Sequence, residues 1–261
     1  MPDASSFSLA DKVIVQFGGT GLLGRALVEA LASAGATTVV ASRNQASLES
    51  LAQTERNAGR SVAIEEVDIT SESSLKALRD RLLLSHGRVD GIVFNAVTRP
   101  MKGYDDAIAS WESSMATNAT GFFASVRIFG DAMAERKRGS IVNISSMMGM
   151  VGMNPHLYTG ISGTPPPDYF FHKAGMINLT RYLASHYGPS GVRVNVVSPG
   201  GIYNPEKPQA PEFLARYAPQ TMLGRMAHAE EIGGSVVFLL SDASTYITGT
   251  NLPVDGGYTA K

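Results

Sequence analysis

Cysteine is absent from the 261-residue sequence. This absence excludes disulfide bonds, thiolate metal sites and catalysis by a thiol, and it is compatible with a reducing compartment. A charge of one sign is lacking too, because 22 basic and 23 acidic side chains give a formal net charge of −1. The sequence therefore gives no electrostatic reason to expect binding to nucleic acid or to a membrane surface.

Long apolar runs are also missing, since no stretch reaches the roughly 20 residues that a helix needs to span a bilayer. The first residues do not combine a basic segment with an apolar one, so we predict no signal peptide and a cytoplasmic protein. His156 and His172, the two histidines nearest the site described below, have no carboxylate cluster beside them, and we predict no metal. What the chain does have is 44% apolar residues, which is typical of a globular protein with a sizeable core.

Short apolar strands alternate with helical patterns along the chain. We expect strands near residues 13–17, 37–41, 62–67, 90–94, 141–144, 192–197 and 251–254. We expect a first helix through about residue 34, and further helices near residues 44–58, 72–86, 104–113, 115–137, 169–187, 211–217 and 229–240. This alternation predicts an α/β fold with one Rossmann-type, doubly wound parallel sheet of about seven strands flanked by helices. Because no repeat or linker interrupts the pattern, we expect residues 1–261 to form a single domain.

A glycine-rich turn joins the first strand to the first helix, with glycines at every third position. Glycine permits a tight turn, a close approach of the backbone to a pyrophosphate and close packing of helix on sheet, while the helix N-terminus attracts phosphate. A loop that only needs glycine conformations would look the same, but the flanking strand and helix favour a dinucleotide site. The candidate cofactor contacts here are Gly18, Thr20, Gly21, Leu22, Leu23 and Gly24.

Ser42 and Arg43 follow the second strand, at the place where a dinucleotide fold contacts the adenosine ribose. An acidic residue here would accept hydrogen bonds from a ribose 2′-hydroxyl and repel a 2′-phosphate. Arginine instead binds phosphate through a fork of donors. We therefore favour NADP(H), with NAD(H) as the alternative. The competing interpretation of Arg43 is a solvated charge after a strand.

Candidate cofactor contacts also follow the third and fourth strands. Asp68 and Ile69 come after the third strand, and Asp68 either accepts a hydrogen bond from an adenine amine or belongs to the cap region of the next helix. Asn95 and Ala96 come after the fourth strand. Since a sheet of this type binds ligands at the carboxyl ends of its strands, we expect these residues near the nucleotide.

Tyr169 and Lys173 lie four residues apart at the start of a predicted helix, so their side chains share one face. A lysine ammonium beside a phenol favours the phenolate, and the phenol can then donate and accept a proton near neutral pH. A hydroxyl from the pair Ser145-Ser146, which ends the preceding strand, can hold a substrate oxygen against the phenol. Asn118 lies inside a predicted helix, where asparagine is unfavourable, and this points to a role for its side chain.

Taken together and in this order, these motifs resemble those of the short-chain dehydrogenase/reductase family of the Tyr-x-x-x-Lys type over nearly the whole chain. The resemblance rests on the glycine turn, Asn95-Ala96, Asn118, Ser146, Tyr169, Lys173, Ser198-Pro199-Gly200 and the segments 246–249 and 254–257. It implies transfer of a hydride between a nicotinamide cofactor and a small-molecule carbonyl or alcohol. It also implies a homotetramer or a homodimer that associates through the helices at 104–137 and 169–187.

The resemblance implies a role for each matching residue. Tyr169 would be the general acid when a carbonyl is reduced and the base in reverse, and Lys173 would favour the phenolate and bind the nicotinamide ribose. Ser146 would orient and polarise the substrate oxygen. Asn118 would hold a water that links Lys173 to solvent. The remaining cofactor contacts implied by the family are Tyr169, Lys173, Pro199, Gly200 and Ile202, the last through its backbone.

The sequence departs from the family pattern in three places. The glycine turn has the spacing G-x-x-G-x-x-G, and Val97 stands where the family has glycine. The step from Ser146 to Tyr169 is 23 residues, which is longer than usual in the family. We predict that the extra segment, which ends in residues 164–167, is not helical and loops over the substrate pocket, and that Asp168 caps a helix beginning at Tyr169.

The main hypothesis from the sequence is an NADP(H)-dependent oxidoreductase. The long serine-to-tyrosine segment also resembles family members associated with bacterial surface-sugar and flagellin modification, so a sugar derivative is one candidate substrate. The alternative is a nucleotide-binding regulatory or structural protein with the same fold and little turnover, against which the complete set of site residues argues. Side chains expected near the pocket are Arg99, Met147, Met148, Met150, Met153, His156, Tyr158 and Tyr203.

Overall fold

Within residues 4–161 and 164–261, which the computed structural model describes, seven strands form one sheet. The strands are β1 (Val13–Phe17), β2 (Thr37–Ser42), β3 (Val62–Glu66), β4 (Gly91–Phe94), β5 (Gly139–Ile144), β6 (Val192–Pro199) and β7 (Asn251–Val254). They lie in the order β3-β2-β1-β4-β5-β6-β7, and every neighbouring pair is parallel. The predicted Rossmann-type sheet is therefore confirmed.

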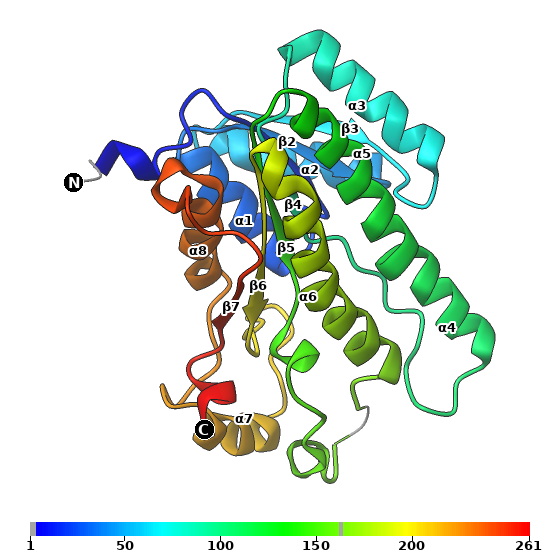
Figure 1. Cartoon of the computed structure of the whole chain (residues 1–261). Helices are drawn as coiled ribbons and strands as arrows, with labels where there is room; N and C mark the ends of the chain where they lie inside the picture. Colours follow the sequence, from blue (N-terminus) through cyan, green and yellow to red (C-terminus); the bar gives the residue numbers. More distant parts are fainter. Residues whose placement is uncertain (1–3, 162–163) are drawn as a thin grey trace.

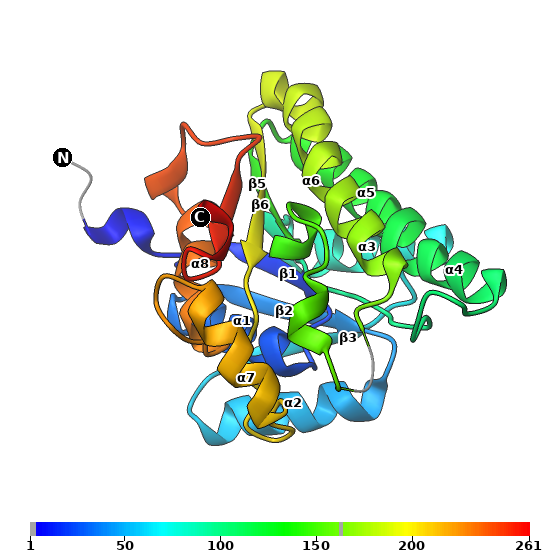
Figure 2. The ribbon, with the colours of Figure 1, turned by 90° about the horizontal axis from the view of Figure 1, so that it is seen from below.

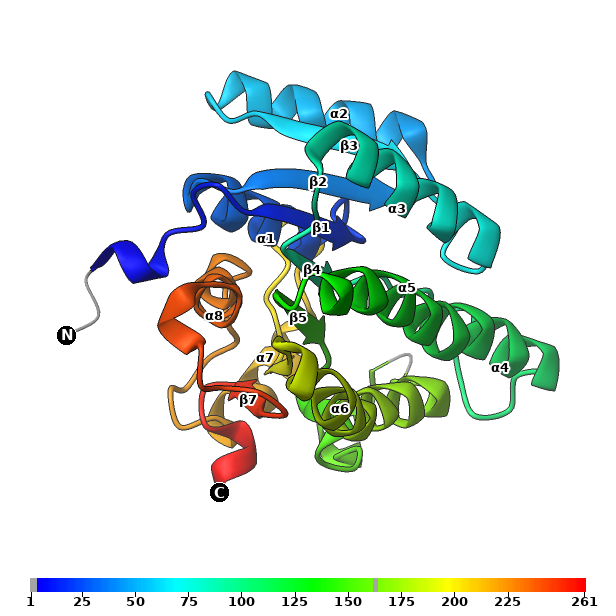
Figure 3. The same cartoon turned by 45° about the horizontal axis from the view of Figure 1, so that its top comes forward.

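Helices cover both faces of this sheet (Figure 1, Figure 3). One face carries α1 (Leu22–Ser33), α2 (Gln45–Asn57) and α8 (Glu230–Leu240), and the other carries α3 (Glu72–His86), α5 (Phe122–Glu135) and α6 (Pro167–Tyr187). Strands covered on both faces read as continuous apolar runs, and all five residues of β1 are buried. A bilayer-spanning helix, which needs both length and apolar composition, is not found among the described residues.

The direction of winding reverses between β1 and β4, which are neighbours in the sheet. From β1 the chain steps outward to β2 and β3, whereas β4 begins the series that runs to β7 on the other side. The loops after β1 and β4 therefore separate toward opposite faces, and a parallel sheet binds its ligands in the crevice at such a point. Figure 2 looks at this end of the molecule, where α7 (Pro211–Tyr217) and the segment after β5 lie in front of the sheet.

One continuous helical run replaces the two helices that we predicted at 104–113 and 115–137. Residues 104–107 are not helical, and the run consists of α4 (Ile108–Met115), a π-helical turn at Ala116–Gly121 and α5. The π turn accommodates one extra residue and contains Asn118. Such turns often occur at functional sites, and they leave no mark in an apolar periodicity, which explains the wrong boundary.

The start of α6 also differs from the prediction. The helix begins at Pro167 rather than at Tyr169, because proline is well suited to the first helical position, where its missing N–H is not needed. Asp168 therefore lies inside the first turn and is not a cap. The extra segment holds a short 3-10 turn at Pro155–Tyr158, and its last residue, Pro167, already belongs to α6, so the prediction that the segment is not helical is wrong in part. Its residues 162–163 lie outside the described residues.

Candidate active site

Two adjoining cavities lie at the carboxyl end of the sheet. The larger has a volume of about 770 Å³ and the smaller about 280 Å³. Gly21, Asn95 and Val97 line both, so the cavities meet at the glycine turn and the end of β4. Predicted cofactor contacts that line only the larger are Leu22, Leu23, Gly24, Pro199, Gly200 and Ile202, together with Tyr169 and Lys173. Those that line only the smaller are Gly18, Thr20, Ser42, Arg43, Ile69 and Ala96.

Asp68 is the one predicted cofactor contact that lines neither cavity. Its Oδ1 accepts hydrogen bonds from the Thr70 hydroxyl at 2.7 Å and the Thr70 backbone N–H at 2.9 Å. These two hydrogen bonds, and more weakly the charge of Arg43, hold the pKa of Asp68 below its usual range. Ser71 caps α3 by accepting from the backbone N–H of Ser74 at 3.3 Å. Asp68 thus stabilises the turn before α3, and a bond from this carboxylate to adenine stays a prediction.

Of the three glycines spaced three residues apart in the turn, Gly18 and Gly24 have no room for a side chain, whereas Gly21 has open space around it. Gly18 has φ of +81°, and a Cβ there would lie 2.6 Å from the backbone of Ala96. A Cβ at Gly24 would overlap the carbonyl oxygen of Gly18. Around Gly21 there is no atom within 4 Å of such a position. The Asn95 amide donates to the Gly18 carbonyl at 2.7 Å, so Asn95 fixes the turn while Gly21 leaves room for a ligand.

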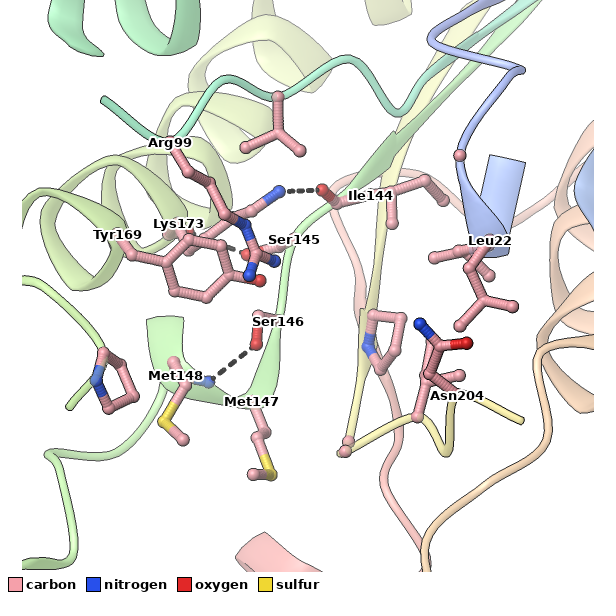
Figure 4. Close-up of a pocket in the computed structure, with 18 of the residues that line it drawn as sticks. Leu22, Arg99, Ile144, Ser145, Ser146, Met147, Met148, Tyr169, Lys173 and Asn204 are labelled. Carbon is pink, nitrogen blue, oxygen red and sulfur yellow. Dashed lines mark hydrogen bonds between the residues drawn. The ribbon is translucent and has the colours of Figure 1, made fainter. Parts of the chain in front are cut away.

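Ser146, Tyr169 and Lys173 all line the larger cavity (Figure 4). Lys173 is only 4% exposed, and its Nζ lies 5.7 Å from the centre of the Tyr169 ring. The ammonium donates to the carbonyl oxygen of Ile144 at 2.6 Å, at the end of β5. Burial, and to a lesser extent the charge of Arg99, lowers the pKa of Lys173 from 10.5 to about 7. Strongly perturbed groups of this kind concentrate at functional sites.

The structure distinguishes the two serines at the end of β5. The Ser145 hydroxyl donates to the backbone carbonyl of Lys173 at 2.8 Å, so this serine ties β5 to α6. The Ser146 Oγ accepts from the backbone N–H of Met148 at 3.1 Å. That bond leaves the hydroxyl proton of Ser146 available to a ligand in the cavity. Both serines line the larger cavity, but only the Ser145 hydroxyl donates to the protein, so Ser146 is the serine whose proton can reach a ligand; its contact with a substrate stays a prediction.

Asn118 lies behind the cavity and does not line it. Its amide forms a matched pair of hydrogen bonds with the backbone of Thr98, one at 3.0 Å from the Thr98 N–H and one at 2.9 Å to the Thr98 carbonyl. Asn118 also donates to the Ser114 hydroxyl at 2.9 Å, and Ser114 donates to an oxygen of Asp168 at 2.5 Å. This network fastens the loop after β4 to the start of α6. The predicted water held by Asn118 stays a prediction.

Known proteins are similar to this chain over nearly its whole length. A family model described as enoyl-(acyl carrier protein) reductase matches residues 21–259. The 2,5-dichloro-2,5-cyclohexadiene-1,4-diol dehydrogenase of Sphingobium indicum is 35% identical, over 97% of this chain and 98% of that protein. The cis-4-hydroxycyclohexanecarboxylate dehydrogenase of Sinomonas cyclohexanicum is 33% identical, over 97% and 98%. The chain belongs to the short-chain dehydrogenase/reductase family.

A solved structure supports the same assignment. The short-chain dehydrogenase of Leptospira borgpetersenii, determined with bound NAD⁺, has a TM-score of 0.86 and 29% identity, and the match covers 99% of this chain and 97% of that one. As a member of the short-chain dehydrogenase/reductase family, the protein is an NAD(P)-dependent oxidoreductase. The suggested link to surface-sugar modification stays a prediction.

Some residues of this short-chain dehydrogenase/reductase escaped the sequence analysis. Ser114 and Asp168 form a buried pair across 54 positions of the chain, and no local pattern indicates their contact. Lys102 lines the larger cavity, seven residues after Asn95. A signal for it existed, because residues that follow a strand's carboxyl end lie near the ligand in this type of sheet.

His172 is a buried histidine beside Tyr169 and Lys173. The ring is buried, and neither of its nitrogens has a hydrogen-bond partner among the described residues. Burial, followed by the charges of Lys173 and Arg99, lowers the pKa of His172 to about 3, so the imidazole is neutral near neutral pH. The imidazole packs edge-on against the Tyr169 ring, with 5.3 Å between the ring centres. Within residues 4–161 and 164–261, no three His, Asp or Glu side chains gather where they could hold a metal ion.

The wall of the larger cavity is apolar on the side that faces α7. Met147, Met148, Tyr158, Phe213 and Met226 line it, and these residues also pack against one another. The extra segment contributes Tyr158 and residues 164–166 to the lining, so these residues lie at the pocket as predicted for the segment. Of the other side chains expected near the pocket, Arg99 lines it, whereas Met150, Met153, His156 and Tyr203 are not among its lining residues.

Proposed function

We propose that the enzyme interconverts a secondary alcohol and a ketone with NADP(H) as its hydride carrier, and that one domain carries the whole site. One observation supports this most directly. Tyr169, Lys173 and Ser146 line the same cavity as the turn at Gly21 and the loop at Ile202. A proton donor, its positioning cation and a substrate-binding hydroxyl are thus placed beside a site suited to a dinucleotide.

The described residues fit such a cofactor. Gly21 stands free of neighbouring atoms at the N-terminus of α1, where backbone N–H groups and the helix dipole suit a pyrophosphate. In the smaller cavity Ser42 and Arg43 would hold an adenosine 2′-phosphate. Pro199, Gly200 and Ile202 would hold the nicotinamide end. When bound, the cofactor supplies or accepts the hydride.

Each catalytic side chain then has a defined task. During reduction the Tyr169 hydroxyl donates its proton to the substrate oxygen, and during oxidation the phenolate accepts it. The Ser146 hydroxyl donates a hydrogen bond to the same oxygen and polarises the carbonyl. Lys173, which donates to the Ile144 carbonyl and lies 5.7 Å from the centre of the Tyr169 ring, would position Tyr169 and bind the nicotinamide ribose. Asn118 keeps the loop after β4 fixed against the helix that carries both residues.

Replacing the phenol tests this mechanism. Tyr169→Phe is expected to retain NADPH binding but to lose at least about 100-fold in kcat, the usual contribution of a positioned general acid. Tyr158→Phe is the matched control, because Tyr158 lines the same cavity without a neighbouring lysine in the described chain, and its kcat should stay within about threefold. A Tyr169→Phe enzyme that reduces ketones at the parental rate contradicts the proposal. Tight NADPH binding without turnover in the parent would favour a regulatory protein.

The preference for NADP(H) has its own test. Arg43→Ala should weaken NADPH binding by about tenfold or more, because a charge-assisted hydrogen bond contributes about 1.5–3 kcal/mol, and should leave NADH binding nearly unchanged. Parallel fluorescence titrations with both nucleotides measure this. The control is Arg56→Ala, which removes an exposed arginine of α2 that lines neither cavity. Equal losses for NADPH and NADH would show that Arg43 does not recognise the 2′-phosphate.

We propose a ring-bearing secondary alcohol as the substrate class. The similar enzymes of Sphingobium indicum and Sinomonas cyclohexanicum are named for alcohols on six-membered carbon rings. An apolar wall that includes three methionines suits such a ring, since the thioether side chain adapts to irregular apolar shapes. A panel of substituted cyclohexanones and keto-sugars, each tested with NADPH, decides between an alicyclic ring and a sugar.

We also propose that the protein lies in the cytoplasm, where NADP(H) is supplied. We further propose a homodimer or homotetramer that associates through α5 and α6. Phe123 on α5 and Phe171 and Tyr182 on α6 are large apolar side chains exposed on these helices. Large exposed apolar side chains that are contiguous mark interfaces, and these three are the candidates on α5 and α6. Light scattering should give a dimer or tetramer for the parent and a smaller species for Phe171→Asp. A monomeric parent would contradict the proposal.

A further inference from the structure

The Arg99 guanidinium, which has no ion-pair partner among the described residues, lies at the larger cavity. The Arg99 guanidinium lies 5.0 Å from the centre of the Tyr169 ring, in a cation–π contact. Arg99 is exposed, and it forms no ion pair with any residue in the described ranges. Figure 4 shows its side chain running beside Tyr169 toward Ser146. The guanidinium is thus oriented toward the place where a substrate would meet the catalytic groups.

Positive charge exceeds negative charge around this cavity. Arg99, Lys102 and Lys173 line it, and among the described lining residues Asp168 is the single carboxylate. One oxygen of Asp168 already accepts from Ser114, and the side chain is 1% exposed. The Lys102 ammonium donates to the backbone carbonyl of Arg99 at 2.8 Å, which supports the Arg99 backbone and adds a second cation at the same edge.

The charge of Arg99 also changes the pKa values of neighbouring side chains. The positive charge of Arg99 contributes to the lowered pKa of Lys173 and of His172. Bringing an anion to the guanidinium would offset this repulsion. The resting site is therefore electrostatically suited to a negatively charged ligand.

The opposite side of the cavity is apolar. Met147 and Met148 lie beyond Ser146 as seen from Arg99 (Figure 4), and Phe213 and Met226 continue the apolar surface. A ligand that spans the cavity would thus meet an apolar wall at one end, Tyr169 and Ser146 in the middle, and a guanidinium at the other end.

We propose that the substrate carries a carboxylate, which Arg99 binds while the apolar body of the substrate packs against the methionine-lined wall. The guanidinium fork matches a carboxylate in two parallel hydrogen bonds, and this pair fixes the orientation of the carbonyl between Tyr169 and Ser146. The placement of the carbonyl rests on the proposed function, whereas the binding of the carboxylate does not. Arg99 is in this assignment a specificity-determining residue.

The cofactor is the competing partner of this guanidinium. Arg99 lines the larger cavity only, whereas Arg43 lines the smaller one next to the glycine turn. Its contact with the Tyr169 ring places it at the catalytic end. A guanidinium that served the cofactor phosphates would affect NADPH affinity, and a fluorescence titration of Arg99→Gln with NADPH measures this separately.

Binding is measured first, because it does not depend on turnover. The enzyme loaded with NADP⁺ is titrated calorimetrically with cyclohexanecarboxylate and with its methyl ester, which has the same ring and no charge. The parent should bind the carboxylate about tenfold or more tightly than the ester, and Arg99→Gln should remove this preference while leaving the ester affinity within about twofold. Arg56→Gln, an exposed arginine outside both cavities, serves as control and should behave as the parent.

Three results would overturn the proposal. The first is equal affinity of the parent for the acid and the ester. The second is an Arg99→Gln enzyme that still binds the acid more tightly than the ester, as the parent does. The third is a loss of NADPH affinity in Arg99→Gln as large as its loss of affinity for the acid. Reduction of 4-oxocyclohexanecarboxylate and its methyl ester is measured afterwards. With Arg99→Gln the acid should lose about 10- to 100-fold in kcat/KM, mostly through KM, and the ester should change little. Absence of turnover with preserved acid binding would count against the proposed reaction but uphold the carboxylate site.

Discussion

The buried ammonium of Lys173 leads to a prediction about stability. Burial and the charge of Arg99 lower the pKa of Lys173 from 10.5 to about 7 in the folded protein. In the unfolded chain a lysine keeps its proton up to about pH 10.4. Between these two values the unfolded state binds more protons than the folded state, so the free energy of unfolding rises with pH. The cofactor-free protein should therefore become more stable from pH 7.5 to pH 9.5.

The size of this effect follows from the two pKa values. One pH unit corresponds to about 1.4 kcal/mol per proton, so the free energy of unfolding should rise by about 2 kcal/mol over this interval. Tyrosines act in the opposite direction only at higher pH. Burial raises the pKa of Tyr217 to about 12, and it raises that of Tyr187 as well. Their unfolded forms ionise near pH 10, so stability is lost only above the chosen interval.

Lys173→Met removes the titrating group and should abolish this rise. The substitution also leaves the Ile144 carbonyl without its donor, at a cost of about 1–3 kcal/mol that does not depend on pH. The slope with pH is therefore the diagnostic quantity, rather than the absolute stability. Urea unfolding at pH 7.5, 8.5 and 9.5 measures it. Lys207→Met, the same change at an exposed lysine, should keep the parental slope.

Equal slopes for the parent and Lys173→Met would refute the reasoning. That outcome would mean that the folded protein keeps the ammonium charged up to the pH at which the unfolded chain loses its proton. Parental and Lys207→Met slopes that differ from each other would show instead that surface lysines dominate the pH dependence.

The remaining predictions concern backbone packing, acid stability and the buried network. Gly24→Ala should abolish NADPH binding in a titration, because the added Cβ would overlap a backbone oxygen of the glycine turn. Gly234→Ala in α8 meets open space and should raise the free energy of unfolding by about 0.5–1 kcal/mol, measured in urea. His172→Leu should lose less stability than the parent between pH 6.5 and 4.5, because the pKa of His172 is about 3 when folded and the unfolded histidine takes up a proton below about pH 6.5; a parallel decline would disprove this. Ser114→Ala should lower the free energy of unfolding by about 1–3 kcal/mol, since a buried oxygen of Asp168 loses its donor; an unchanged urea midpoint would show that the bond contributes nothing.

Local signals predicted most of the elements correctly. The apolar run of β1, followed by glycines at every third position, indicated a strand, a turn and a helix, and all three are present. Short polar residues precede two of the expected helices: Ser71 caps α3, and Asn44 caps α2, which begins at Gln45 rather than at residue 44 as expected. These features depend on residues that are close in sequence, so the sequence suffices to predict them.

The errors lie where the backbone departs from a regular period. The π turn at Ala116–Gly121 inserts one residue into a helical run, and its stabilisation comes from the bonds between Asn118 and the loop at Thr98. Asp168 looked like a cap because it follows three prolines, yet Pro167 already begins α6. A contact from another element accompanies the π turn, whereas the early start of α6 follows from the suitability of proline for the first helical position.

By itself the sequence determined the order of strands and helices, the position of the glycine turn, and the shared face of Tyr169 and Lys173, because periodicity, turn chemistry and helix spacing act over a few residues. Only the tertiary structure decided that Arg99 lies over Tyr169 and that Ser114 reaches Asp168. Such contacts join residues far apart in the chain. They depend on how the elements pack around the sheet, and packing is a property of the whole fold rather than of any one segment.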